Sequence, residues 1–330
     1  KNTFKISNLS LSPNYKINFI EEFNFNFLND SKKKNEILFK KNNKNYELSG
    51  KFFDGTILLD QILESDNEGN VFDILNDFNS NVKVSINKVF IDKTNHLNNL
   101  NGILKFKKSN LKNLNLTANF LLDKKLTFTI NTNQNNEKIT TLYSEYAKPL
   151  VKKYKFIKGF EEGYLDFYSL KKNNKSKSTL KINDFKLKEL PALTKILTLA
   201  SLQGIADLLT GEGIRFNEFE MKFKNENKLM TIDEIYAIGP AISLMMDGYV
   251  QNDELISLRG TLVPATTLNK VIGSLPLLGD ILVGKKTGEG VFGVSFKIKG
   301  PPKKTKTTVN PIKTLTPRFI TRTIEKIKKN

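Results

Sequence analysis

The stretch Phe23-Asn24-Phe25-Asn26-Phe27 alternates strictly between an aromatic and a polar residue. Successive side chains of a β-strand point to opposite faces, so this stretch predicts a strand with one apolar and one polar face. Polar clusters separate it from further runs of the same kind, which predicts a succession of antiparallel hairpins up to about residue 190. The runs are Val82, Val84 and Ile86; Leu114, Leu116, Ala118 and Phe120; Leu126, Phe128 and Ile130; Leu180 and Ile182.

A sheet of such strands has one apolar face that needs a cover. Few helices are available in this part of the chain, since only Ile74–Phe78 and Glu145–Tyr154 could each form a short one. Two alternatives follow. The sheet either closes on itself, as a sandwich does, or stays open as a trough with an apolar floor, and the closed form is the commoner of the two.

One longer helix is predicted from Pro191 to Thr210, because Pro191 suits the first helical position and Gly211 the stop. Its broad apolar face predicts packing on the sheet, and its charged residues argue against a membrane span. Strands return from Gly213 to Lys299, interrupted at 264–284 by an apolar stretch that we expect to form two short helical turns.

The last thirty residues are predicted to form a proline-containing connector, from Pro301 to Pro311, and a basic amphipathic helix. The apolar residues Ile312, Leu315, Phe319, Ile320, Ile324 and Ile327 share one side of that helix. Our hypothesis is that the helix contacts a membrane. An alternative is that it docks on the sheet or on a partner protein. The residues proposed for membrane contact are Arg318, Phe319, Ile320, Arg322, Ile324 and Ile327.

The chain has 330 residues and a formal net charge of +18, from 52 basic and 34 acidic side chains. Such a charge suits an anionic membrane surface or a nucleic acid. Arginine, which recognises bases and phosphates in a bidentate manner, occurs only at Arg215, Arg259, Arg318 and Arg322. The aromatic residues are segregated on one face of the strands, as in a core or an apolar binding surface. Nucleic acid is therefore not the expected partner, although stretch 152–156 mixes lysine with aromatic residues.

No catalytic constellation is visible in the sequence. Stretch 279–286 departs from the phosphate-binding loop pattern because Lys286 replaces its hydroxyl residue. His96 is the only histidine and cysteine is absent, so a transition-metal site lacks the necessary ligands. We therefore expect a protein that is not an enzyme and uses no cofactor or metal.

Several ordered motifs between about Leu190 and Phe319 resemble the C-terminal region of AsmA-like proteins, especially the YhdP-like branch. They are Pro191-Ala-Leu through Leu199-Ala-Ser-Leu-Gln-Gly204, Leu209-Thr-Gly-Glu-Gly-Ile214, Asp247-Gly-Tyr, Leu258-Arg-Gly-Thr-Leu-Val-Pro-Ala265, Leu275 through Gly284, Gly290-Val-Phe-Gly-Val294 and Val309-Asn-Pro311. The first 190 residues match the family only in their repeated β character.

The resemblance implies an elongated antiparallel sheet, curled into an open hydrophobic groove, in the periplasm of a Gram-negative bacterium. It also implies an anchor in the inner membrane through an N-terminal segment that is absent from this chain. Members of the family look like bridges along which phospholipid moves toward the outer membrane, without catalytic residues. With the resemblance, we expect the open groove rather than the closed sandwich.

The resulting expectation is lipid transport: non-enzymatic conveyance of phospholipid between the two membranes, in support of outer-membrane biogenesis. Phospholipid, the membrane surface and other envelope proteins are the expected partners, and scaffolding of outer-membrane protein maturation is the alternative. We expect three segments: a β-hairpin groove over 1–190, an AsmA-like region over 191–300, and the connector with its basic helix over 301–330. The residues predicted to line the groove are Phe23, Phe25, Phe27, Val84, Ile86, Leu116, Phe120, Phe128, Ile130, Ile182, Phe219, Met221 and Phe223.

Overall fold

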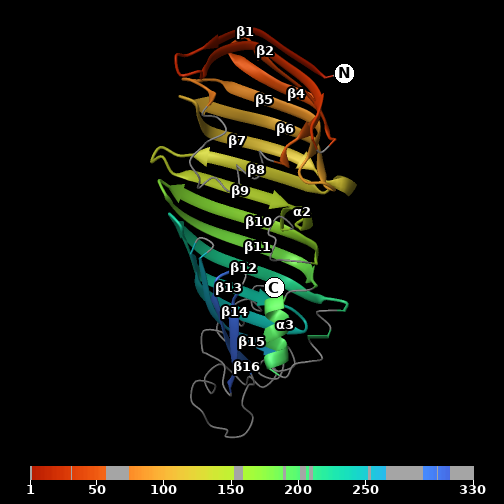
Figure 1. Cartoon of the computed structure of the whole chain (residues 1–330), viewed down its shortest axis with the longest axis vertical. Coiled ribbons are helices and arrows are strands. Elements are labelled where there is room, and N and C mark those ends of the chain that lie inside the picture. The colour runs from red at the N-terminus through yellow and green to blue at the C-terminus, as the bar shows by residue number, and fades with distance from the viewer. Residues whose placement is uncertain are drawn as a thin grey trace, which may run out of the picture. The chain divides into compact units, whose positions relative to one another are not determined.

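The structure, a computed structural model, is mainly β, and its strands form one open sheet of 17 strands (Figure 1). It describes residues 2–30, 32–56, 74–151, 159–188, 191–200, 206–207, 211–251, 254–264, 293–302 and 304–312. The prediction of a mainly β fold built on an open sheet is confirmed. Contacts divide the chain into two units, 1–149 with 164–176 and 150–163 with 177–330, rather than at residues 190 and 300.

Unit 1 contains the first nine strands and most of the tenth. The strands are β1 (Thr3–Leu11), β2 (Ile17–Leu28), β3 (Lys34–Asn42), β4 (Asn45–Asp54), β5 (Asn81–Phe90), β6 (His96–Lys107), β7 (Asn110–Asn119), β8 (Lys125–Thr132), β9 (Lys138–Ser144) and β10 (Phe160–Lys172). A short 3₁₀ turn, η2, covers Leu121–Asp123, and the one-turn helix α2 covers Lys148–Val151.

Unit 2 contains most of the remaining elements. They are β11 (Lys175–Leu187), helix α3 (Pro191–Leu199), β12 (Ile214–Glu226), β13 (Leu229–Ile238), β14 (Ile242–Gln251), β15 (Leu255–Pro264), β16 (Gly293–Gly300) and β17 (Lys306–Ile312). Within this unit, β12 to β17 pair in chain order, each antiparallel to the next.

In unit 1, β1 to β10 also pair in chain order, and one pairing corrects the prediction of antiparallel hairpins throughout. Strand β4 runs parallel to β5, with Leu48 opposite Val84. Parallel neighbours need a crossover longer than a hairpin turn, and residues 55–80 provide the length. Because alternation along a strand is the same in either direction, the sequence pattern does not distinguish the two cases.

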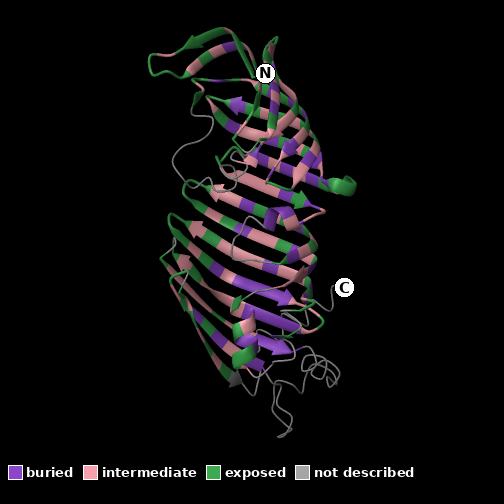
Figure 2. Ribbon diagram, turned by 45° about the vertical axis from the view of Figure 1, so that its right-hand side comes forward, coloured by how far each residue is buried: buried purple, intermediate pink, exposed green. Residues whose placement is uncertain are grey.

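Strand β5 shows the alternation most regularly. Val82, Val84 and Ile86 are buried, whereas Lys83 and Ser85 between them are exposed. Figure 2 shows buried and exposed residues in alternating bands along the strands. Each strand thus presents two different faces, as the period of two requires.

The helix predictions have mixed outcomes. Helix α3 begins at Pro191 as predicted, buries Leu193, Ile196 and Leu197, and contacts β17. Its predicted second half lies largely outside the described residues, although the Gly211 amide donates to the Asp207 carbonyl at 2.9 Å, as in a helical turn. The predicted helical turns within 264–284 lie outside the described residues, apart from Pro264, which ends β15.

The prediction of a short helix at Ile74–Phe78 is wrong. Leu75 forms a parallel bridge with Ile17, and the Asn76 amide donates to the Ile17 carbonyl at 2.8 Å. The Phe78 amide donates to the Ser109 hydroxyl at 3.0 Å. Because these amides donate to Ile17 and Ser109, which lie outside the segment, they do not close a helical turn. Of the predicted helix at Glu145–Tyr154, Lys148–Val151 form α2, whereas Glu145–Ala147 are not helical and residues 152–154 lie outside the described residues.

Residues 306–311, predicted as part of a connector, belong instead to strand β17, and so does Ile312, predicted to be helical. Val309 lies opposite Phe296 and Pro311 opposite Val294 on β16. Proline is tolerated at the margin of a sheet, where a missing amide costs little, so Pro311 does not prevent pairing. The remainder of the predicted basic helix, 313–330, lies outside the described residues.

A polar cluster ties together the ends of several strands of unit 1. The Lys33 ammonium lies 3.6 Å from the Asp54 carboxylate and donates to the Asp92 carbonyl at 2.7 Å. Asp54 also accepts hydrogen bonds from Thr56 and from the Asn29 amide. Burial opposes ionisation of Asp54, but these hydrogen bonds and the Lys33 charge outweigh it and lower its pKa.

We expect Asp54→Asn to make the stability of the protein less sensitive to acid. A carboxyl whose pKa is lowered by folding stabilises the folded state above its unfolded pKa of about 4 and loses this contribution as the pH falls through its folded pKa. Wild type should therefore be the more stable protein at neutral pH and should lose more of its free energy of unfolding on acidification. Urea unfolding at a series of pH values measures this, and parallel pH profiles for the two proteins would contradict it.

Candidate functional site

One continuous row of apolar residues crosses ten strands of unit 1. Each member lies directly opposite the next, and directly opposed residues share a face of the sheet. We call this set the apolar row, and from β1 to β10 it consists of Ile6, Phe23, Phe39, Leu48, Val84, Gly102, Leu116, Phe128, Leu142 and Phe167. Nine of its members carry an apolar side chain, so the face is apolar on every strand except at Gly102.

The neighbouring row points to the other face and has the opposite character. We call it the polar row, and it consists of Lys5, Asn24, Leu38, Ser49, Ser85, Asn101, Thr117, Thr127, Tyr143 and Asp166. Leu38 is its only aliphatic member. Each strand therefore separates an apolar from a polar face, and the registers align the ten strands so that the separation is never reversed.

The apolar row is not sealed by the described protein. Only Val84, Phe128 and Leu142 among its ten members are buried, with exposed fractions of 4%, 7% and 9%. The other seven remain accessible to solvent, and Ile6 on β1 is 40% exposed. A contiguous apolar surface that stays accessible is typical of a binding surface rather than of a core.

Aromatic residues flank the row at both ends of the strands. At one end, the Phe78 ring lies 5.2 Å from the Tyr46 ring and 5.4 Å from the Phe106 ring, measured between centroids. At the other end, the Phe120 and Tyr146 rings are 5.6 Å apart in an edge-to-face arrangement. These aromatic contacts lie at the two margins of the apolar face, and the apolar row lies between them.

Most of the residues predicted to line the groove in unit 1 lie on this face. Phe23, Val84, Leu116 and Phe128 are members of the apolar row. Next to it, Phe25, Ile86, Ile130 and Phe27 point the same way by the two-residue alternation, and Phe27 is 37% exposed at the end of β2. Phe120 follows the end of β7 and is 2% exposed, packed against Tyr146.

The predicted residues of unit 2 lie in a different setting. Phe219, Met221 and Phe223 share one face of β12 and are half-buried, whereas Ile182 on β11 is buried. The row that starts at Phe219 continues through Ala237, Leu244, Leu262 and Val294. These four are at most 9% exposed, so protein covers the row from β13 to β16, whereas Phe219 itself is half-buried.

Several members of the apolar row were not predicted from the sequence: Ile6, Phe39, Leu48, Gly102, Leu142 and Phe167. Phe39 lies in the unbroken apolar run 37–39, where alternation gives no assignment of faces. Gly102 has no side chain to signal a face. Strand partners decide both cases, because Phe39 lies opposite Phe23 and Gly102 opposite Val84.

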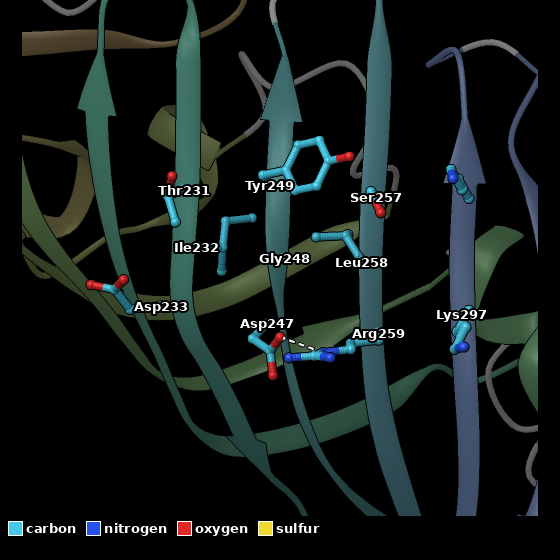
Figure 3. A pocket seen from close by; sticks show the side chains of 11 residues that line it. Thr231, Ile232, Asp233, Asp247, Gly248, Tyr249, Ser257, Leu258, Arg259 and Lys297 are labelled. Atoms are coloured by element: carbon cyan, nitrogen blue, oxygen red, sulfur yellow. Dashed lines mark hydrogen bonds and ion pairs between the residues drawn. The ribbon is translucent and has the colours of Figure 1, made fainter.

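A hollow of about 670 Å³ lies over β13 to β16 in unit 2 (Figure 3). Here the sequence motifs Asp247-Gly-Tyr and Leu258-Arg-Gly pair with each other, and Arg259 Nε donates to Asp247 Oδ1 at 2.8 Å. Gly248 is required at this crossing, because a Cβ there would lie 2.1 Å from the Ser257 carbonyl oxygen and its φ is +147°. Gly248 therefore occurs in the motif because the backbones of β14 and β15 approach closely at this point.

The features of an enzyme site are sparse in the part of the chain that the structure describes. His96 lies near Phe90, and burial together with the Lys88 charge lowers its pKa. Within the described ranges, no three His, Asp or Glu side chains gather as metal ligands. The described helices are also too short or too polar to span a bilayer.

The fold and the apolar row together define a class of protein, an open amphipathic β-sheet with one accessible apolar face. Comparison of the chain with protein-family models, with curated proteins and with solved structures finds no match. The resemblance to AsmA-like proteins therefore stays a prediction that rests on the motifs alone.

Proposed function

We propose that the chain conveys phospholipid, without enzymatic activity, along the apolar face of its sheet. The observation that supports this most directly is the apolar row, which continues across ten strands and stays accessible at seven positions. A core of the ordinary kind would bury such residues, as unit 2 buries Ala237, Leu244, Leu262 and Val294.

The energetics of lipid movement favour such a surface. Transfer of each buried methylene group into water costs about 0.8 kcal/mol, so a lipid with two long acyl chains crosses an aqueous gap very slowly unaided. An apolar row lowers this cost on every strand. Because hydrophobic contact has no preferred direction, a chain can slide from one strand to the next without breaking directional bonds.

The cellular setting follows from the resemblance and belongs to the same proposal. The chain would act in the periplasm of a Gram-negative bacterium, anchored to the inner membrane, and support outer-membrane biogenesis in contact with phospholipid, the membrane surface and envelope proteins. The helix proposed for membrane contact, with Arg318, Phe319, Ile320, Arg322, Ile324 and Ile327, lies outside the described residues.

We expect the purified chain to carry phospholipid and to accelerate its transfer between vesicles. Native mass spectrometry detects bound lipid, and dequenching of a fluorescent phosphatidylethanolamine measures transfer from donor to acceptor liposomes. The apolar row should make transfer proportional to protein concentration, because each chain offers its own surface.

The alternatives give different results in these assays. A scaffold for outer-membrane protein maturation would carry no lipid and leave the transfer rate at its uncatalysed value. A protein that binds single-stranded nucleic acid would show oligonucleotide affinity that falls steeply with salt. Either result, without bound lipid, would overturn the proposal.

A further inference from the structure

Three polar residues lie in line on the apolar face of unit 1, at one end of the strands. Thr132 on β8 is opposite Lys138 on β9, and Lys138 is opposite Lys171 on β10. They point the same way as the apolar row, because each lies four residues along its strand from a row member. Those members are Phe128, Leu142 and Phe167.

Lys112 on β7 lies near this line, at a shift in the register between β6 and β7. It borders, together with Thr132, a hollow of about 470 Å³. Lys112, Lys138 and Lys171, which we call the lysine cluster, are all half-buried. Burial lowers the pKa of Lys138, and the charges of Lys171 and Lys112 lower it further. The positive charges of these lysines thus lie close together, and their mutual repulsion lowers the stability of the fold.

The nearest carboxylate along the chain does not compensate Lys138. Glu137 precedes Lys138, and its carboxylate is 3.4 Å from the ammonium of Lys172, which points away from the apolar face because it follows Lys171. Among the described residues, no acidic side chain forms an ion pair with Lys112 or Lys138. The Thr132 hydroxyl is buried and, over the same residues, has no hydrogen-bond partner.

The chemistry of the apolar face changes stepwise along β8 to β10. The apolar row comes first, at Phe128, Leu142 and Phe167. Ile130, Thr140 and Ser169 follow, and then Thr132, Lys138 and Lys171. The first and last lines are four residues apart, roughly 13 Å. This order, from apolar through hydroxyl to cationic groups, matches the order of groups in an anionic amphiphile.

We propose that the lysine cluster and Thr132 bind the phosphate of an anionic phospholipid whose acyl chains lie on the apolar row. Lysine ammonium groups and a threonine hydroxyl supply hydrogen-bond donors, and phosphate oxygens accept them. The bound anion would satisfy the Thr132 hydroxyl and offset the repulsion among the lysines. This inference rests on the proposed lipid function and adds a preference for headgroup charge.

The test compares two short-chain probes, dioctanoyl phosphatidylglycerol and dioctanoylglycerol, by titration calorimetry with the full chain. Wild type should bind the phosphate-containing probe more tightly. Lys138→Gln and Lys171→Gln should each reduce the ratio of the two affinities about fivefold, the effect of losing one lysine near an anionic headgroup. Lys138→Arg, which keeps the charge, should retain most of the preference.

Lys172→Gln is the matched control, since it removes the same charge one residue away on the other face and should leave the ratio unchanged. A ratio unaffected by Lys138→Gln and Lys171→Gln, in variants with wild-type melting temperatures, would overturn the headgroup site but leave lipid binding intact. Failure of wild type to bind either probe would overturn the proposed function as well. Inorganic phosphate bound as tightly as phosphatidylglycerol would show an anion site that does not depend on lipid, and would also overturn the inference.

Discussion

Leu116→Asp is expected to reduce phospholipid transfer by about tenfold or more while the protein stays folded. Leu116 lies at the middle of the apolar row, between Gly102 and Phe128, and is only half-buried. A carboxylate there would either be desolvated by a passing acyl chain or hold water on the row, and both raise the barrier to sliding. Vesicle transfer of a fluorescent phospholipid measures the effect, and circular dichroism confirms the fold.

Thr117→Asp is the control for this substitution. Thr117 is the next residue, exposed on the polar row between Asn101 and Thr127, so the same charge faces water. We expect its transfer rate to match wild type. Equal loss in both variants would indicate a general effect of charge on β7, and equal retention would contradict conveyance along the apolar row. Phe128→Asp is less informative, because Phe128 is 7% exposed and a buried carboxylate there would destabilise the fold.

Gly102→Ala is expected to destabilise the protein by about 3 kcal/mol. Its added Cβ would lie 1.9 Å from the carbonyl oxygen of Asn115 on β7, far inside van der Waals contact. The φ of Gly102, +157°, also falls in a region that side chains disfavour. Because backbone must move to relieve the contact, β6 and β7 would separate at the centre of the apolar row. The midpoint of urea unfolding measures the loss.

Ser85→Ala is the matched control for the glycine substitution. Ser85 lies on the polar row of β5, one residue from Val84, which is the partner of Gly102. It is exposed, so its replacement should change the free energy of unfolding by less than about 0.5 kcal/mol. A change as small for Gly102→Ala would contradict the close approach of β6 and β7.

Individual faces could be predicted from the sequence wherever the alternation was clear. Phe23, Phe25, Val84 and Ile86 were assigned to one apolar face, and the strand registers place them there. Such an assignment succeeds because side-chain direction along a strand is a local property with a period of two residues. It fails in unbroken apolar runs such as 37–39, which satisfy either face.

The residues proposed to bind the lipid headgroup show the limit of prediction from sequence more clearly. Thr132 and Lys138 flank one hairpin turn and Lys171 lies on a later strand, and each looks like an ordinary turn-flanking polar residue. Only the registers of β8, β9 and β10 bring them into line with one another and with the apolar row. A shift of one residue in either pairing would send a lysine to the polar face, so no single strand contains the site.

The sequence by itself determined that this chain is β-rich and that its strands are amphipathic. Tertiary structure alone decided that β4 runs parallel to β5 and that residues 306–312 form a strand. It also decided that most of the apolar row of unit 1 is accessible, whereas Ala237, Leu244, Leu262 and Val294 of unit 2 are buried. The physical reason is the range of the interactions. Alternation depends only on the order of neighbouring residues. Strand register and the burial of the apolar face depend instead on hydrogen bonds and packing between different segments of the chain.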